Sequence, residues 1–237
     1  MKLYVNGCSF TYGHETNENL KSIKEVRPTW TWSDHLAKHF DKLINEAWPG
    51  GSNHRAARRT LKFFDRCVDP TDWIAVIQIT DPISRFEFFS NSLNMHVGVL
   101  ADYHVLDDRH YRFQLEKLQE LKDQTRAQIS NRLKNNDDLA LHTEWFQQLI
   151  ELHTRLDDFG VKHLFIPMSS RCSPRVIIDE HSNDEIKKLY SKLPQNLFLD
   201  HMSKVTNKLS NDGHPDKQGH KEIYEYILSE LQKRNYL

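Results

Sequence analysis

The sequence predicts an α/β protein with a mostly parallel sheet of five strands and helices on both faces of that sheet. Its 237 residues are long enough for one large domain with a substantial core. Hydrophobic residues make up 38% and aromatic residues 11%, which excludes a disordered chain. Short apolar runs alternate with helical patterns, as in parallel strands joined by crossover helices.

Five apolar runs predict the strands. The third run is nearly continuous and rich in β-branched residues, which is typical of a strand that is buried on both faces. The five predicted strands are Leu3–Val5, Leu43–Ala47, Trp73–Ile79, His163–Pro167 and Asn196–Leu199.

Apolar residues at three- and four-residue steps predict helices between the strands. Ser33 is the expected N-cap of the first helix, and the second follows Ser52 and Asn53. A third ends the chain. Their apolar stripes are Trp32, Leu36, Phe40 and Leu43; Ala56, Thr60, Phe63 and Phe64; and Ile223, Ile227 and Leu231.

Residues 107–159 interrupt this alternation with two long helical patterns and almost no strand signal. The second pattern ends at Gly160, an expected C-cap, and fits a crossover helix. The first predicts a helical insertion, a lid or a dimer arm, over about residues 90–145 of a single domain 1–237. The apolar positions are Leu115, Leu118, Leu121 and Ile129, then Trp145, Leu149, Leu152 and Leu156.

Charge and cysteine content narrow the expected partners. A net charge of -1 gives no overall attraction to nucleic acid or anionic lipid, and no apolar run approaches the roughly 20 residues that span a bilayer. The N-terminus predicts a strand rather than a signal peptide. Cys8, Cys67 and Cys172 form neither a disulfide framework nor a metal knuckle. We therefore expect a cytoplasmic protein without metal or cofactor that binds neither nucleic acid nor a membrane; its oligomeric state is not predicted.

Polar residues follow the predicted strands, where open parallel sheets bind ligands. Ser9 follows the first strand, Gly50 the second and Thr80 the third, while Asp212 and His214 precede the last helix. Together they supply a nucleophile, a base with an orienting acid, and oxyanion donors. The pattern predicts a catalytic site at one edge of the sheet.

Four motifs resemble the sequence blocks of the SGNH (GDSL-type) hydrolases. Gly7-Cys8-Ser9-Phe10-Thr11 resembles the first block, with Cys8 and Phe10 replacing the usual Asp and Leu. The resemblance spans nearly the whole chain apart from the helical insertion. The other three motifs are Asn45-Glu46-Ala47-Trp48-Pro49-Gly50, Gln78-Ile79-Thr80-Asp81 in the position of G-x-N-D, and Asp212-Gly213-His214-Pro215.

This resemblance implies a three-layer α/β/α, flavodoxin-like fold and a serine esterase or deacylase that acts on a small ester, such as an O-acyl group on a carbohydrate. Ser9 would be the nucleophile, and His214 would take its proton and return it to the leaving alcohol. Asp212 would orient the imidazole. The backbone N–H groups of Ser9 and Gly50 would bind the oxyanion.

Two positions depart from the family pattern. Thr80 stands where the third block has an oxyanion-binding Asn, so its hydroxyl or the side chain of Asn53 is the expected donor. The family also places its Asp three residues before the His, where this chain has Asn211. Asp212 is favoured as the acid, since only a carboxylate stabilises the imidazolium, and Asn211 is the alternative.

Three further side chains allow a structural or a functional interpretation. Arg85 either forms a structural ion pair or reaches over the pocket to bind an acidic or hydroxyl-rich substrate. His35 and His39 have a metal-ligand spacing, but no third ligand or HExxH glutamate accompanies them, so surface histidines are expected.

Two other functions compete with the esterase. A non-catalytic domain that binds a glycan or a protein partner would retain the fold with a decayed site, and the changes at the third and fourth blocks favour it. A metal-dependent phosphoesterase would need a carboxylate and histidine cluster, which the sequence does not assemble.

Overall fold

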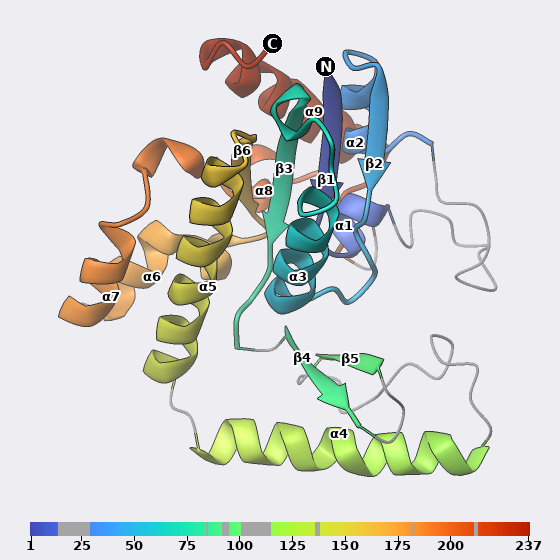
Figure 1. The fold of residues 1–237 in the computed structure, drawn as a ribbon, viewed down its shortest axis with the longest axis vertical. Helices are drawn as coiled ribbons and strands as arrows, with labels where there is room; N and C mark the ends of the chain where they lie inside the picture. The colour runs from blue at the N-terminus through green and yellow to red at the C-terminus, as the bar shows by residue number, and fades with distance from the viewer. Residues whose placement is uncertain are drawn as a thin grey trace.

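Four parallel strands form the central sheet in the computed structural model, which describes residues 1–13, 29–83, 85–91, 95–100, 115–135, 138–181, 183–210 and 213–237. Their spatial order is β2-β1-β3-β6 (Figure 1). The strands are β1 (Lys2–Asn6), β2 (Lys42–Asn45), β3 (Trp73–Ile79) and β6 (Lys162–Pro167). Four of the five strand predictions are thereby confirmed.

Successive residues of the central strand β3 face opposite sides of the sheet, as the period of a strand requires. Ala75 and Ile77 pack under α3 (Asn53–Phe64) and α5 (Asp138–Asp158). Ile74 and Val76 pack under α2 (Trp32–Ala37) and α9 (Lys217–Lys233). Helices therefore cover both faces (Figure 1), and the predicted α/β/α layering is confirmed.

The helix starts follow capping chemistry. Ser52 caps α3 by accepting a hydrogen bond from the Arg55 N–H. The prediction of Ser33 as the N-cap of α2 is wrong. Thr31 is the N-cap, and it forms a capping box with Asp34 that places Ser33 inside the helix.

The prediction of a fifth strand over Asn196–Leu199 is wrong. Pro194 precedes a 3₁₀ turn, η5 (Gln195–Leu197), and Phe198 forms one isolated parallel bridge with Phe165. Leu197 and Phe198 are nevertheless buried in the core under α5. The apolar run thus indicates that the segment is buried. An irregular segment that packs in the core explains such a run as well as a strand does.

The inserted region contains a β-hairpin that the sequence analysis did not predict. Strands β4 (Arg85–Ser90) and β5 (Met95–Leu100) pair antiparallel, and α4 (Leu115–Asn135) packs Ile129 against Phe86. Both predicted long helices, α4 and α5, are confirmed, and Gly160 ends α5 with a φ of 69°. Figure 1 shows α4 and the hairpin extending from the carboxyl edge of the sheet.

Short helical segments complete the described chain, in which no helix is both long and apolar enough to cross a bilayer. They are α1 (Ser9–Tyr12), α6 (Pro174–His181), α7 (Asp184–Tyr190), α8 (Met202–Val205), η1 (Pro70–Asp72) and η4 (Ser170–Cys172).

A buried histidine pair makes stability depend on pH. His163 Nδ1 lies 2.8 Å from the Val161 carbonyl and its Nε2 lies 2.9 Å from His153 Nδ1. These contacts fit neutral rings, with each Nδ1–H donating. Burial lowers the pKa of His163 from 6.5 to about 4. As the pH falls below 6.5, His163 therefore binds a proton in the unfolded chain but stays neutral in the folded chain.

We expect the free energy of unfolding to drop by about 2 kcal/mol between pH 7.5 and pH 5 through His163, because the stabilisation is present above pH 6.5 and is lost between pH 6.5 and about 4. Urea unfolding at the two pH values measures this drop. His163→Gln should reduce the difference, whereas His201→Gln, at a half-buried position, should leave most of it. An unchanged pH dependence in His163→Gln would contradict the assignment.

Candidate active site

The candidate nucleophile begins a short helix directly after the first strand. Ser9 is the first residue of α1 and is only 6% exposed. Gly7 precedes it with a φ of 151°, and a Cβ there would lie 2.6 Å from Gln78 Oε1. Gln78 Oε1 also accepts hydrogen bonds from the Cys8 N–H and the Thr11 hydroxyl, at 3.1 and 2.7 Å. The end of β3 thereby fixes the turn that presents Ser9.

The structure brings His214 to this serine from the other end of the chain. His214 Nε2 lies 2.8 Å from Ser9 Oγ, although 205 residues separate the two. The Phe10 ring packs on the imidazole with centroids 4.9 Å apart. The His214 carbonyl accepts hydrogen bonds from the N–H and the hydroxyl of Ser210, at 2.8 and 2.9 Å. These two hydrogen bonds from Ser210 help to hold His214 beside Ser9.

The predicted orienting acid lies in the segment just before His214. Asp212 and its alternative Asn211 both lie outside the described residues. The next carboxylate along the chain, Asp216, caps α9 by accepting from the Gly219 N–H at 2.8 Å. Asp212 and Asn211 therefore remain the two predictions for this role.

Gly50 lies in a turn that packs against the nucleophile turn. The Gly51 N–H donates to the Trp48 carbonyl at 2.8 Å, and Gly50 has a φ of 72° after Pro49, which is the pattern of a type II turn. The Trp48 N–H donates to the Gly7 carbonyl at 3.1 Å. A Cβ on Gly51 would lie 2.7 Å from that carbonyl oxygen. This close approach holds the Gly50 turn against the Ser9 turn.

Thr80 and Asn53, the two alternative side-chain donors, are bonded to each other. The Thr80 N–H donates to Asn53 Oδ1 and Asn53 Nδ2 donates to the Thr80 carbonyl, both at 2.8 Å. The Thr80 hydroxyl lies 3.3 Å from the same Oδ1. Asn53 thus ties the start of α3 to the carboxyl end of β3, and donation by either side chain to an oxyanion remains a prediction.

We expect Asn53→Ala to lower kcat about tenfold or more, because it removes two hydrogen bonds that hold the end of β3 in place. Thr80→Val should change kcat by less than about threefold, since its hydroxyl makes only the longer contact. Steady-state hydrolysis of an aryl ester measures both. A large loss of kcat at constant KM in Thr80→Val would instead assign the Thr80 hydroxyl to the oxyanion.

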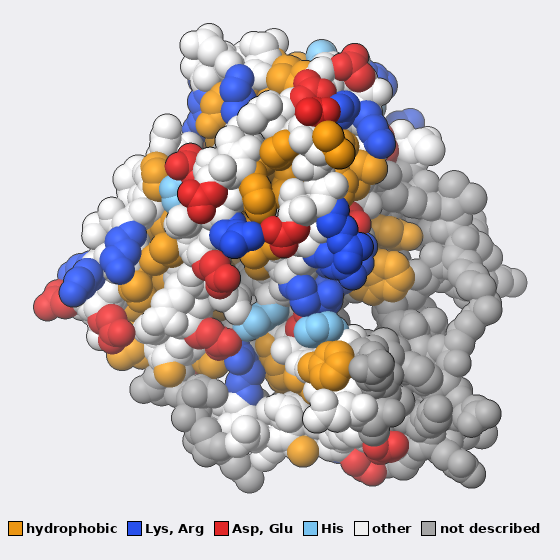
Figure 2. Space-filling model, viewed as in Figure 1, with side chains coloured by type: hydrophobic (Ala, Val, Ile, Leu, Met, Phe, Trp, Pro, Cys, Tyr) orange, Lys and Arg blue, Asp and Glu red, His pale blue; other side chains and the backbone are white. Residues whose placement is uncertain are grey.

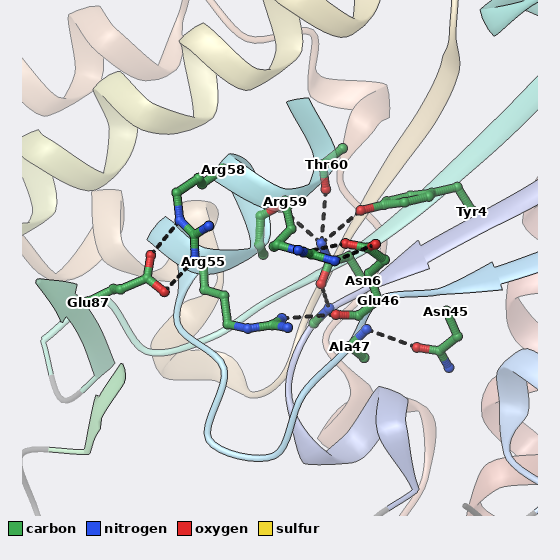
Figure 3. A network of polar contacts seen from close by, with 12 residues as sticks. Tyr4, Asn6, Asn45, Glu46, Ala47, Arg55, Arg58, Arg59, Thr60 and Glu87 are labelled. Carbon is green, nitrogen blue, oxygen red and sulfur yellow. Dashed lines mark hydrogen bonds and ion pairs between the residues drawn. The ribbon is translucent and has the colours of Figure 1, made fainter. Parts of the chain in front are cut away.

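Asn6 is a supporting residue that the sequence analysis missed. Its Nδ2 donates to Tyr4 Oη, the Ala56 carbonyl and Thr60 Oγ1 at 3.0 to 3.1 Å, and its Oδ1 accepts from the Gly7 N–H at 2.8 Å. Figure 3 shows it at the centre of this network, between β1 and α3. The sequence contained one signal for this role, because Asn6 is a polar residue at the end of an otherwise apolar strand.

The arginines of α3 point to two glutamates (Figure 3). Arg59 forms a bidentate pair with Glu46, and Arg58 forms one with the buried Glu87. Arg85 therefore does not pair with Glu87, its neighbour on β4. Its role in substrate binding remains a prediction.

His35 and His39 both contact Tyr224 on α9. The His35 ring lies 5.4 Å from the tyrosine ring, and His39 Nε2 lies 3.0 Å from its hydroxyl. These contacts give the two histidines a packing role between α2 and α9.

The side chains of Ser9 and His214 thus meet at the carboxyl edge of a parallel sheet that lies between two helix layers, in an α/β/α protein. The fold is the one found in the SGNH hydrolases. No family model and no curated protein matches the sequence.

Three solved structures are similar over nearly all of this chain. TesA has a TM-score of 0.52 and 13% identity, covering 98% of this chain and 99% of its own. The psychrotrophic esterase EstA from Pseudoalteromonas sp. has a TM-score of 0.53 and 11% identity, covering 100% and 99%. The acetyl xylan esterase Est2A from Butyrivibrio proteoclasticus has a TM-score of 0.53 and 11% identity, covering 98% and 63%. At these identities the likeness shows a shared fold.

Proposed function

We propose that this protein is a serine esterase or deacylase that hydrolyses a small ester through Ser9, His214 and Asp212. The observation that carries the proposal is the 2.8 Å distance between His214 Nε2 and Ser9 Oγ. A general base that activates a nucleophile needs this separation, of about 2.6–3.2 Å. The shared fold with the esterases EstA and Est2A supports the same chemistry.

In the proposed reaction, Ser9 Oγ attacks the ester carbonyl while its proton passes to His214 Nε2. The backbone N–H groups of Ser9 and Gly50 stabilise the oxyanion of the tetrahedral intermediate. Collapse expels the alcohol, which takes the proton from His214. Water, activated by the same histidine, then releases the acid from Ser9. Asp212 orients the imidazole and stabilises its charged form.

The substrate class that we propose is an O-acyl group on a carbohydrate. Trp48 is 39% exposed and precedes Gly50 by two residues. Its ring and the Tyr12 ring form an edge-type contact with centroids 6.3 Å apart, and the Arg55 guanidinium lies over it, 5.6 Å from the ring centroid. An aromatic face beside the oxyanion turn can pack against a sugar ring. The name of Est2A, an acetyl xylan esterase, agrees with this class.

A second candidate is a non-catalytic domain that binds a glycan or a protein partner. The observation that favours it is Thr80 in the position of the family's third-block Asn, with its hydroxyl toward Asn53. Such a domain would bind its ligand without an activated serine.

Labelling with a fluorophosphonate separates the two candidates, because the reagent reacts covalently only with an activated serine. We expect one label per chain, lost in Ser9→Ala and retained in Ser170→Ala, whose exposed serine lies just beyond β6 at the same edge of the sheet. Absence of labelling in the folded wild-type protein would favour the binding domain.

A further inference from the structure

A narrow recess lies where the inserted hairpin and α4 meet the body of the protein. His54 of α3 and Trp145 of α5 line it from the body, while Arg85 of β4 and Arg132 of α4 line it from the insertion. Figure 2 shows histidine side chains and side chains of the Lys or Arg colour gathered along the boundary between these two parts. The recess is therefore built by elements that are distant in the sequence.

Several hydrogen-bond donors of the recess are buried without a partner. Arg85 Nη1, Arg132 Nε and Trp145 Nε1 make no hydrogen bond within the described part of the chain. Trp145 is only 2% exposed. Since nearly all buried donors in folded proteins have a partner, three such donors around one recess indicate a missing acceptor-rich group.

One acceptor of the recess, Gln148 Oε1, is also buried without a hydrogen-bond partner, whereas the carboxylate there is engaged. Glu144 accepts from His54 Nε2 at 3.0 Å and from Arg132 Nη1 at 3.1 Å. The hydrogen bond from His54 is the main cause that lowers the pKa of Glu144, so this side chain is a carboxylate. Among the described residues that line the recess, Glu144 is the one carboxylate and Arg85 and Arg132 carry two guanidinium groups. The described part of the chain gives Arg85 no ion pair. The recess keeps an excess positive charge.

We propose that this recess binds an anionic group, a carboxylate or a phosphate, carried by the ester substrate. This inference rests on the proposed esterase function. Arginine forks match the oxygens of both groups, and their hydrogen bonds to anions are stronger than neutral ones.

The recess lies close in the fold to the site of Ser9. Asn53 lines the recess and also forms hydrogen bonds with the backbone of Thr80. Thr80 directly follows β3, the strand that pairs with β1. Pro82, two residues beyond Thr80, lines it as well. In this conformation the recess has no room for a water molecule, so the side chains of Arg85 and Arg132 must move apart before the anionic group enters. One substrate can then place its ester at Ser9 and its anionic group between these two arginines. The insertion thereby contributes to specificity.

The test compares esters that differ only in charge. On the acyl side, 4-nitrophenyl hemisuccinate is compared with 4-nitrophenyl butyrate; on the alcohol side, 3-carboxyphenyl acetate is compared with phenyl acetate. We expect the wild-type protein to prefer the charged ester in at least one pair by kcat/KM. Arg85→Gln and Arg132→Gln should each reduce that preference about tenfold or more, as expected for loss of a charge-assisted hydrogen bond.

Arg126→Gln is the matched control, because Arg126 lies on the same helix as Arg132 and its side chain is 69% exposed. It should leave the preference unchanged, and Arg132→Lys should restore part of it. Thermal unfolding checks that each variant folds. No preference for charge in either pair, or an equal preference in the wild type and both arginine variants, would overturn the proposal.

Direct binding separates this inference from the esterase function. Calorimetric titration of the wild-type protein and the two arginine variants with succinate and with inorganic phosphate requires no turnover. Binding by the wild-type protein that is lost in both variants supports an anion site in the recess even if no ester is hydrolysed. The anion that binds more tightly indicates whether the site prefers a carboxylate or a phosphate. Hydrolysis of the neutral esters without any anion binding would overturn the inference and leave the esterase function intact.

Discussion

Ser9→Ala is expected to lower kcat for a short-chain aryl ester such as 4-nitrophenyl acetate by about 10⁶-fold, the scale found for the nucleophile of the serine protease subtilisin. The change removes the atom that lies 2.8 Å from His214 Nε2. Ser9 is 6% exposed, and alanine fits the same space, so the fold should be retained. Stopped-time assays at high protein concentration, with thermal unfolding as the fold check, measure the effect.

His214→Ala should cost about as much as Ser9→Ala, and the double variant little more, because a nucleophile and its base act as one unit. Ser170→Ala is the matched control and should keep full activity, since Ser170 is exposed in η4, beyond β6. Turnover that survives in Ser9→Ala would transfer the chemistry to another residue.

Asp212→Asn should lower kcat by about 10⁴-fold, as the equivalent change does in chymotrypsin-type enzymes. An amide keeps the shape of the carboxylate but neither stabilises the imidazolium nor holds the ring in the tautomer that accepts the proton of Ser9. The binding of substrate should change little, so the loss is expected in kcat rather than in KM.

Asn211→Ala is the control for that prediction and should cost much less. Gly213, with a φ of 81°, separates Asp212 from His214 and gives the backbone a turn there. The opposite ranking, with Asn211→Ala the more damaging change, would make Asn211 the residue that orients His214 and Asp212 a residue of the turn.

Most of the layer structure could be predicted because it depends on local periodicity. The apolar runs of β1, β2, β3 and β6 and the helical stripes of α3, α5 and α9 are properties of neighbouring residues. The wrong prediction at Asn196–Leu199 has the same origin, since the apolar run reports burial and not hydrogen bonding. The β4–β5 hairpin was missed, although its strands carry aromatic and β-branched residues that favour strands, such as Phe86, Phe88 and Val97.

The candidate site could be predicted only as a set of residues at strand ends. Ser9 and His214 were found from their positions and from the motifs around them, and the structure brings them within hydrogen-bond distance. Asn6 and Gln78, which hold the turn before Ser9, were missed as functional residues. A polar residue that ends a buried strand has no partner visible in its own segment.

The sequence by itself determined the alternation of strands and helices, the edge of the sheet at which polar residues gather, and Ser9 as the candidate nucleophile. Only the tertiary structure decided which of those polar residues meet. It joined Asn53 to Thr80 and brought Arg85 and Arg132 to Trp145. The physical reason is that secondary structure follows from the spacing of neighbouring side chains, whereas these contacts form only when the sheet, its helices and the insertion pack together.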